Sequence, residues 1–221
     1  MIQVRNLVKD YRTKFQENHV LKEVNFDIES ESVTAITGTS GCGKSTLLNI
    51  MCGLVSADEG SITFDETEIT ALSHDDVVAF RLNHCGLVFQ NFRLISTLNV
   101  RENILLPMRE KMGVIDESWY DTLINMAGLQ SLETSMPFQL SGGEQQRTAI
   151  VRALITKPEY IFADEPTGNL DQESTTRVMN FMVELARKEH LTLVFVTHDM
   201  DLCSYADRIL CIKDHTVKVL Q

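Results

Sequence analysis

A loop with the spacing G-x-x-x-x-G-K-[ST] is the part of this sequence best suited to chemistry, and a predicted strand (residues 33–37) and helix (residues 46–52) flank it. The glycines let successive backbone N–H groups point into one concavity, and the helix N-terminus adds partial positive charge. Lys44 is then placed to reach β- and γ-phosphates, and the Ser45 hydroxyl to ligate Mg²⁺. A glycine-rich turn with a solvated lysine is the alternative, but it leaves the full spacing unexplained. We therefore expect a nucleoside triphosphate to contact Gly38, Thr39, Ser40, Gly41, Cys42, Gly43, Lys44, Ser45 and Thr46.

An acidic pair, Asp164–Glu165, follows an apolar stretch (residues 160–163) that predicts a buried strand. Acidic pairs are frequent after strands, so the phosphate loop upstream is what gives this pair meaning. A site for Mg²⁺ and nucleotide needs a carboxylate across from the serine ligand. We expect Asp164 to hold Mg²⁺ through water, and Glu165 to polarise the attacking water or act as its base.

Two further polar residues end predicted strands. Gln90 ends the strand at residues 85–90, and its side chain offers an oxygen for a metal and an amide for a water. His198 follows the strand at residues 191–197. Strand ends are commonly polar, so neither residue is informative alone. Because ligands of open α/β sheets bind beyond the carboxyl ends of the strands, we expect both beside the phosphate loop.

A second candidate anion site begins the helix that ends before Pro158. Ser141 with Glu144 three residues later is a capping box, which is the purely structural explanation. Capping does not account for Gly142 and Gly143, two poor helix formers in the first turn. Paired glycines suit the close approach of another backbone or of a phosphate. Two such sites in a chain with one phosphate loop suggest that one is donated to another copy.

The elements that position these residues predict an α/β protein in three parts. Alternating apolar residues before the phosphate loop predict a small antiparallel sheet, to which residues 61–65 add a strand. Tyr11, assigned to the segment linking the first strands, is a candidate for stacking on an adenine ring, although exposed loop tyrosines are common. Residues 91–158 predict a helical lobe with a helix C-cap at Gly128. Residues 209–212 and 217–219 predict a final hairpin, after which we expect no regulatory domain.

Composition narrows the class of protein. The 20 basic and 31 acidic residues give a net charge of −11, which argues against binding nucleic acid or anionic lipid. No apolar run reaches the length of a membrane-spanning helix, and we expect no signal peptide at the N-terminus. Five cysteines without C-x-x-C spacing indicate reduced thiols, four of them in the core. Cys42 differs because it lies in the phosphate loop, where alkylation is expected to block hydrolysis of a bound nucleoside triphosphate and the bound nucleotide to protect the thiol.

These motifs occur together in the order typical of ABC-transporter nucleotide-binding subunits, which the chain resembles over its whole length. The run 163–171 is similar to the branch containing the LolD, MacB and FtsE ATPases. The motifs that carry the resemblance are the phosphate loop, Gln90, Leu140–Gln145, Ile161–Glu165, Asn169–Asp171 and His198.

The resemblance implies a P-loop NTPase (RecA-like) fold in a single domain over residues 1–221. Residues 1–90 and 159–221 would form a parallel-sheet core with an antiparallel β subdomain, and residues 91–158 the helical subdomain. It implies an ATPase that uses ATP and Mg²⁺ and closes as a head-to-tail dimer around two ATP molecules.

Roles for single residues also follow from the resemblance. The phosphate loop and Asp164–Glu165 of one copy would face Ser141, Gly142, Gly143 and Glu144 of the other. The other implied roles are adenine stacking for Tyr11, metal and water binding and coupling to the helical lobe for Gln90, a contact across the dimer for Asp171, and γ-phosphate sensing for His198.

A membrane partner is implied as well. An integral-membrane permease or mechanotransmitter would dock near Gln90, on a surface that includes Phe92, Arg93 and Leu94, on the cytoplasmic side of the membrane. Export of a lipoprotein, a peptide or a drug is the expected function.

An ATP-dependent dimer switch that regulates an envelope protein without moving cargo uses the same residues, so the sequence leaves this alternative open. A soluble ABC protein of translation or DNA repair is disfavoured, because this acidic chain has neither a second cassette nor a long coiled-coil insertion.

Overall fold

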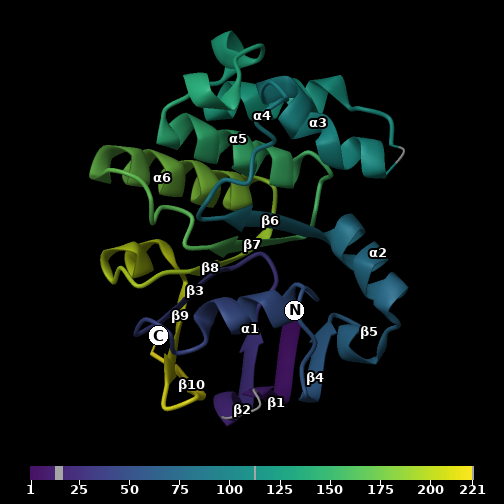
Figure 1. Cartoon of the computed structure of the whole chain (residues 1–221), viewed down its shortest axis with the longest axis vertical. Coiled ribbons are helices and arrows are strands. Elements are labelled where there is room, and N and C mark those ends of the chain that lie inside the picture. The colour runs from purple at the N-terminus through teal and green to yellow at the C-terminus, as the bar shows by residue number, and fades with distance from the viewer. Residues whose placement is uncertain (13–16, 112, 221) are drawn as a thin grey trace.

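Two β-sheets with helix α1 (Lys44–Met51) between them organise the fold (Figure 1). The structure is a computed structural model and describes residues 1–12, 17–111 and 113–220. The antiparallel sheet contains, in spatial order, β2 (Glu17–Ile28), β1 (Ile2–Arg12), β4 (Glu59–Phe64) and β5 (Thr67–Glu68). The second sheet contains β10 (Thr216–Val219), β9 (Arg208–Lys213), β3 (Val33–Gly38), β8 (Thr192–Val196), β7 (Tyr160–Asp164) and β6 (Cys85–Phe89).

The second sheet is parallel from β9 to β6, and apolar side chains cover both of its faces. Strand β8 shows the alternation that this burial requires. Val194 and Val196 point toward α1 and the antiparallel sheet, whereas Leu193 and Phe195 join the core beneath the helices. The sheet is therefore the central layer of three, which confirms the predicted fold class.

Helices cover the other face of the parallel sheet and form the upper part of Figure 1. They are α3 (Val100–Glu110), α4 (Glu117–Ala127), α5 (Gly142–Leu154) and α6 (Gln172–Lys188), with short 3₁₀ turns at Gln130–Leu132, Pro137–Gln139 and Asp201–Tyr205. Gly128 ends α4 in the left-handed conformation, as its position predicts. Apolar side chains of α3–α5 are continuous with those of the sheet. The division into a nucleotide-binding core and a helical subdomain at residues 91–158 stays a prediction.

Helix α2 (His74–His84) was not expected from the sequence, because none of its residues is buried and it therefore lacks apolar periodicity. A short 3₁₀ turn, Ile69–Ala71, precedes it. The local signal for α2 is Ser73, whose hydroxyl accepts the backbone N–H of Asp76 as an N-cap. A cap marks where a helix begins, but only packing or hydrophobic periodicity shows that it continues.

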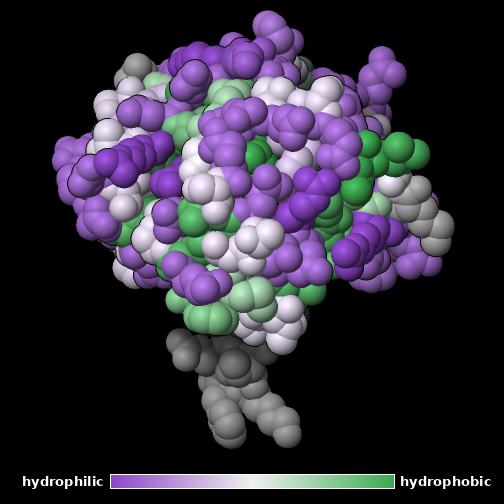
Figure 2. All heavy atoms as spheres, turned by 90° about the horizontal axis from the view of Figure 1, so that it is seen from above, coloured by the Kyte–Doolittle hydropathy of each residue, from purple (hydrophilic) through white to green (hydrophobic). Residues whose placement is uncertain are grey.

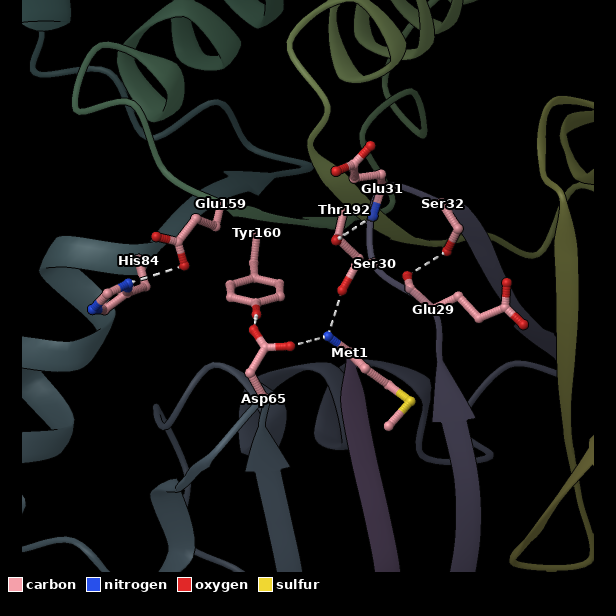
Figure 3. Close-up of polar contacts among 10 residues, drawn as sticks. All are labelled: Met1, Glu29, Ser30, Glu31, Ser32, Asp65, His84, Glu159, Tyr160 and Thr192. Atoms are coloured by element: carbon pink, nitrogen blue, oxygen red, sulfur yellow. Dashed lines mark hydrogen bonds and ion pairs between the residues drawn. The ribbon is translucent and has the colours of Figure 1, made fainter.

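Polar contacts join the two sheets at the amino ends of the parallel strands, opposite the edge where the site lies (Figure 3). Tyr160, at the start of β7, donates to Asp65 Oδ2 over 2.5 Å, and the α-amino group of Met1 pairs with the same carboxylate. These donors lower the pKa of Asp65, while burial and the carboxylate raise that of Tyr160. Nearby, Thr192 accepts the backbone N–H of Glu31 at 3.0 Å. These contacts fix the amino-terminal edge of the parallel sheet, whereas the carboxyl-terminal edge is where ligands are expected to bind.

The helical end of the molecule, seen in Figure 2, is covered mostly by hydrophilic residues, with hydrophobic side chains gathered toward the right of that view. In the described ranges, no helix combines the length and the apolar character needed to cross a membrane. The five cysteines, all within those ranges, are free thiols. Cys52, Cys85 and Cys203 are buried as expected, but Cys211 is partly exposed, because it lies near the open carboxyl end of β9.

Candidate active site

The phosphate loop joins β3 to α1, as predicted, and two of its glycines are required by close packing. Gly38 and Gly43 have φ values of +147° and +104°, in the region where side chains are strained. A β-carbon at Gly38 would lie 2.6 Å from the carbonyl oxygen of Ile212, and one at Gly43 would lie 2.7 Å from Val20. The loop is therefore folded tightly against β9 and β2, with its backbone N–H groups at the start of α1.

Lys44 is the first residue of α1 and is buried, with 6% of its surface exposed. Its ammonium group donates to the carbonyl oxygens of Gly38 and Thr39, each over 3.0 Å. A buried ammonium needs such partners, because desolvation of a charge is costly. The positive charge is thus held over the loop, where a phosphate would contact it.

Ser45 and Asp164 meet beside the loop, although 118 residues separate them in the chain. The Ser45 hydroxyl donates to Asp164 Oδ1 over 2.8 Å. The sheet order β3-β8-β7 brings them together, because Asp164 ends β7 two strands away from β3. Burial raises the pKa of Asp164, the neighbouring Glu165 adds to this, and the Ser45 hydrogen bond opposes it.

A hydroxyl and a carboxylate oxygen form a donor set that suits Mg²⁺, which prefers oxygen ligands and keeps substrate phosphates and waters in its shell. Within the described residues, histidine, cysteine and acidic side chains nowhere gather in threes as a preformed metal cage. The pair therefore fits a metal that arrives with a nucleotide, rather than a resident structural metal.

Glu165 and His198 face each other across neighbouring strands. The His198 Nδ1 atom lies 3.1 Å from Glu165 Oε1. Glu165 has a φ of +44°, and its N–H donates to the carbonyl oxygen of Val196 over 3.1 Å. A left-handed glutamate is uncommon, and strained residues of this kind cluster at functional sites. The strain directs the carboxylate beyond the sheet edge, toward the histidine.

Gln90 follows β6 and is fixed by Asn169. The Gln90 side-chain amide donates to Asn169 Oδ1 over 3.4 Å, and Asn169 Nδ2 donates to the Gln90 carbonyl over 3.1 Å. A β-carbon at Gly168 would lie 2.6 Å from Gln90 Nε2. Gln90 therefore lies against the loop that follows Glu165, on the predicted edge of the sheet. Asn169 is a positioning residue that sequence reasoning noted only as part of a motif.

A cavity of about 890 Å³ opens at this edge, which is large enough for a nucleotide. Its walls include Gly38, Ser40, Glu165 and His198, together with the half-buried Cys42. Of the described residues, those that line it do not include Tyr11.

Tyr11 lies on β1, where it is 44% exposed, and Lys9 approaches its ring to 5.5 Å. Its placement in the linking segment was therefore wrong, because β1 extends to Arg12; residues 13–16 of that segment lie outside the described residues. Adenine stacking by Tyr11 stays a prediction.

The signature segment begins α5, and its capping box is present. Glu144 Oε2 accepts the N–H and the hydroxyl of Ser141, each at 2.7 Å, and Ser141 Oγ accepts the N–H of Glu144. These donors lower the pKa of Glu144. Within the described part of the chain, the residues that line the 890 Å³ cavity do not include this segment. One chain therefore brings the phosphate loop, Asp164, Glu165 and His198 together, but not Ser141–Glu144.

The structure adds a second explanation for the two signature glycines. A β-carbon at Gly142 would lie 3.2 Å from Leu170, and one at Gly143 would lie 3.2 Å from Ser174. The same chain thus supplies a closely packed neighbour, which the sequence pattern left to a phosphate or to another backbone. Close packing within the chain is thus one reason for glycine at both positions, and the approach of a phosphate stays a prediction.

Asp171 is the N-cap of α6, a role missed from the sequence. Its carboxylate accepts the N–H of Ser174 at 2.8 Å and the hydroxyl at 3.0 Å, and the N–H lowers the pKa of Asp171. The signal was an aspartate placed before an apolar-periodic helix. A contact across a dimer stays a prediction for this residue.

Comparisons with known proteins agree with this geometry. A family model described as ABC transporter matches residues 21–168. The chain is 36% identical to the bacitracin export ATP-binding protein BceA of Halalkalibacterium halodurans, over 97% of this chain and 85% of that protein. It is 40% identical to the macrolide export ATP-binding/permease protein MacB of Pasteurella multocida, over 97% of this chain and 33% of that longer protein.

A solved structure shows the same fold with ligands and as a dimer. It is the dimeric ATP-binding cassette MJ0796 in a post-hydrolysis state, bound to ADP and Pi. The two chains align with a TM-score of 0.89 and 34% sequence identity, over 100% of this chain and 99% of the other.

Proposed function

Because the chain belongs to the ABC transporter family and hydrolyses ATP, we propose that it is the ATPase subunit of a membrane transporter or mechanotransmission complex and works as a dimer of two copies. The observation that carries the proposal is the separation of the two anion sites. The cavity at the phosphate loop contains Glu165 and His198, whereas the capped start of α5 lies outside it. A head-to-tail dimer would bring the start of α5 in one copy to the cavity of the other.

Each residue of the site then has a part in hydrolysis. Lys44 and the loop N–H groups bind the phosphates, and Ser141 to Glu144 of the second copy close over them. Ser45, Asp164 and Gln90 would hold Mg²⁺, which neutralises phosphate charge when bound. Glu165 polarises or deprotonates the attacking water. His198 is held by Glu165 at 3.1 Å and contacts the γ-phosphate.

The work driven by ATP is proposed to be export or force transmission at the cytoplasmic side of the cell membrane. BceA and MacB are named for export of bacitracin and of macrolides, and MacB carries a permease in the same chain. A lipoprotein, a peptide or a drug is the corresponding class of cargo here. The permease or mechanotransmitter would be a separate chain docked near Gln90, at Phe92, Arg93 and Leu94.

Dimer formation is tested with Glu165→Gln, which removes the carboxylate but keeps the shape of the side chain. With ATP and Mg²⁺ this variant is expected to sediment as a dimer, and with ADP as a monomer. A monomer at saturating ATP, both alone and with the membrane partner present, contradicts the proposed dimer. The ADP sample is the matched control, because it differs only in the nucleotide.

The membrane role is tested by using the ATP-bound Glu165→Gln dimer to capture partners from membranes solubilised in mild detergent. A multi-span protein is expected, and it should stimulate the ATPase activity of the parent chain when both are reconstituted in vesicles. Movement of cargo in those vesicles identifies a transporter. Stimulation without movement favours the regulatory switch, and exclusively soluble partners contradict the membrane role.

A further inference from the structure

The turn that follows Gln90 is strained, and no glycine relieves it. Phe92 and Arg93 have φ values of +52° and +49°, so two consecutive residues with β-carbons adopt the left-handed conformation. That conformation is unfavourable for bulky side chains, because the β-carbon crowds the following carbonyl oxygen. Such a turn persists only where surrounding contacts hold it.

Arg152, a residue of α5, supplies those contacts. Its Nη1 atom donates to the carbonyl oxygen of Arg93 over 2.6 Å, and its Nη2 atom to that of Phe92 over 2.8 Å. The Arg93 guanidinium in turn lies over the Phe89 ring, 3.7 Å from its centre. Both strained residues are therefore held by one planar guanidinium, and the second of them also packs on the end of β6.

Burial lowers the pKa of Arg152, and the nearby Arg93 guanidinium lowers it further. A cation in such surroundings depends on its hydrogen-bond acceptors, because it is partly removed from water. The two turn carbonyls serve as those acceptors. The guanidinium and the strained turn therefore stabilise each other.

The position of this pair in the fold gives it a role. The turn directly follows Gln90, which lies against Asn169 beside the active-site glutamate. Arg152 lies on the helix that begins with Ser141 and Gly142. We propose that Arg152 is a positioning residue that couples the signature helix to Gln90 by holding the Phe92–Arg93 turn in its strained conformation. This rests on the proposed role of Gln90 in hydrolysis.

Movement of α5 withdraws the guanidinium, and the turn then relaxes to ordinary φ values and carries Gln90 with it. The turn would then have two conformations, one held by Arg152 and one released, and it lies between Gln90 and the helix of the signature segment, as coupling between sites requires. Because the strain is stored in the backbone of two residues, a small shift of α5 suffices to change the preferred conformation.

The test combines Arg152→Lys with two substitutions of Arg93. Lysine keeps the charge but is a compact donor that does not reproduce the planar fork across two carbonyls. Arg152→Lys is expected to lower kcat for ATP by about tenfold with little change in KM, as misplacement of a catalytic group does. Adding Arg93→Gly removes the side chain and the left-handed strain at this residue, while Phe92 keeps its own strain. Adding Arg93→Ala removes the side chain but keeps the β-carbon and therefore the strain.

The glycine double variant is expected to regain part of the lost kcat, because one of the two strained residues is then relieved, and the alanine double variant is expected to regain none. Equal rates in the two double variants overturn the proposal, because relief of strain would then have no effect. A loss in Arg152→Lys that appears in KM, or only in the thermal midpoint, also overturns it. Gln90→Ala is measured in parallel. If Gln90→Ala hydrolyses ATP at the rate of the parent, the proposed role of Gln90 is overturned. If the glycine and alanine double variants have equal thermal midpoints, the proposal that Arg152 holds a strained turn is overturned.

Discussion

The phosphate-loop region and the signature region both fit an anion, but they are built in different ways. In the first, residues distant in sequence contact one another, as Ser45 does with Asp164 and Glu165 with His198. In the second, Ser141 and Glu144 contact each other three residues apart. The first site needs the whole sheet to form, whereas the second is a capped helix end. One chain therefore assembles the phosphate-loop site, and the residues described as lining its cavity do not include the signature segment.

The supports of the two regions differ as well. The strands that lead to Asp164 and His198 are buried on both faces by apolar side chains. Helix α5 contacts the strained turn through Arg152, which donates to the carbonyl oxygen of Arg93. The same helix contains Gln146, which is fully buried. Within the described residues, neither polar atom of the Gln146 side chain has a hydrogen-bond partner. A region held by unfavourable conformations is the one expected to move when ATP binds.

The largest effect is expected from removing the charge of the phosphate-loop region. Lys44→Ala should lower ATP hydrolysis by about a hundredfold or more, since it deletes a preorganised cation at the phosphates. Phosphate release measured at saturating ATP checks this. The thermal midpoint should change little, because Lys44 bonds loop carbonyls and not a carboxylate. Activity above one-tenth of the parent would exclude Lys44 from the site.

A smaller effect is expected from Ser141→Ala in the signature region. The substitution removes an N-cap, worth about 1 kcal/mol, and a hydroxyl that is proposed to meet the phosphates of the other copy. We expect hydrolysis to fall about tenfold or more, the scale of a lost transition-state donor, while a monomer binds ATP as before. Fluorescent-nucleotide binding and phosphate release separate the two readouts.

Ser73→Ala is the matched control for that prediction. Ser73 is also a serine N-cap, with its hydroxyl accepting the N–H of Asp76 at the start of α2. Both variants lose one cap, so both should lose similar stability. If Ser73→Ala loses as much activity as Ser141→Ala, the effect at Ser141 is structural and the two regions do not share a ligand.

Sequence reasoning predicted the phosphate-loop region well because its signals are local. Strand, loop and helix followed from glycine spacing and apolar runs, and the sheet rule placed Asp164 and His198 at one edge. The final hairpin predicted at residues 209–212 and 217–219 is present as β9 and β10, and its turn holds Asp214 and His215 at φ values of +53° and +65°. The loop and the turn depend on a few neighbouring residues, whereas the edge position of Asp164 and His198 follows from a general rule of parallel sheets.

The features that the sequence did not predict arise from packing between distant segments. Nothing local distinguishes Phe92 and Arg93 from residues of an ordinary turn; their conformation depends on Arg152, about 60 residues away. The extent of β1 through Tyr11 depends on pairing with β2. The burial of Gln146 depends on what covers α5, because a glutamine in a helix is ordinarily a surface residue.

Gln146→Met tests whether the buried amide of Gln146 destabilises the packing of α5. The substitution keeps the length of the side chain and removes both unpaired polar groups. The free energy of unfolding is expected to rise by roughly 1–2 kcal/mol, because a buried amide without partners is replaced by an apolar group. Urea unfolding at constant slope checks it. Gln145→Met is the control, since Gln145 donates to the Leu140 carbonyl at 3.2 Å and should lose stability when replaced. A stability loss in Gln146→Met would show that this amide is satisfied and that α5 is seated without frustration.

The smallest effect is expected when acid protonates Asp207, a residue that supports the start of β3, the strand leading into the phosphate loop. Asp207 accepts the N–H of Val33, where β3 begins, and pairs with Arg187 of α6 at 2.8 Å. Burial opposes ionisation, but these two partners outweigh it and lower the pKa of Asp207. The folded protein therefore holds this proton less tightly than the unfolded chain, so the contribution is complete above the ordinary value of 3.8 and is lost as the pH falls below it. Because the carboxylate is 43% exposed, water screens the pair and the contribution is about 0.5 kcal/mol.

Asp207→Asn keeps an acceptor for Val33 but cannot titrate, so its stability relative to the parent should be lower at about pH 6 and nearly equal at about pH 3. Urea unfolding at the two pH values measures the difference. A constant difference would mean that the charge of Asp207 does not support β3, and that the phosphate-loop region depends on apolar packing alone.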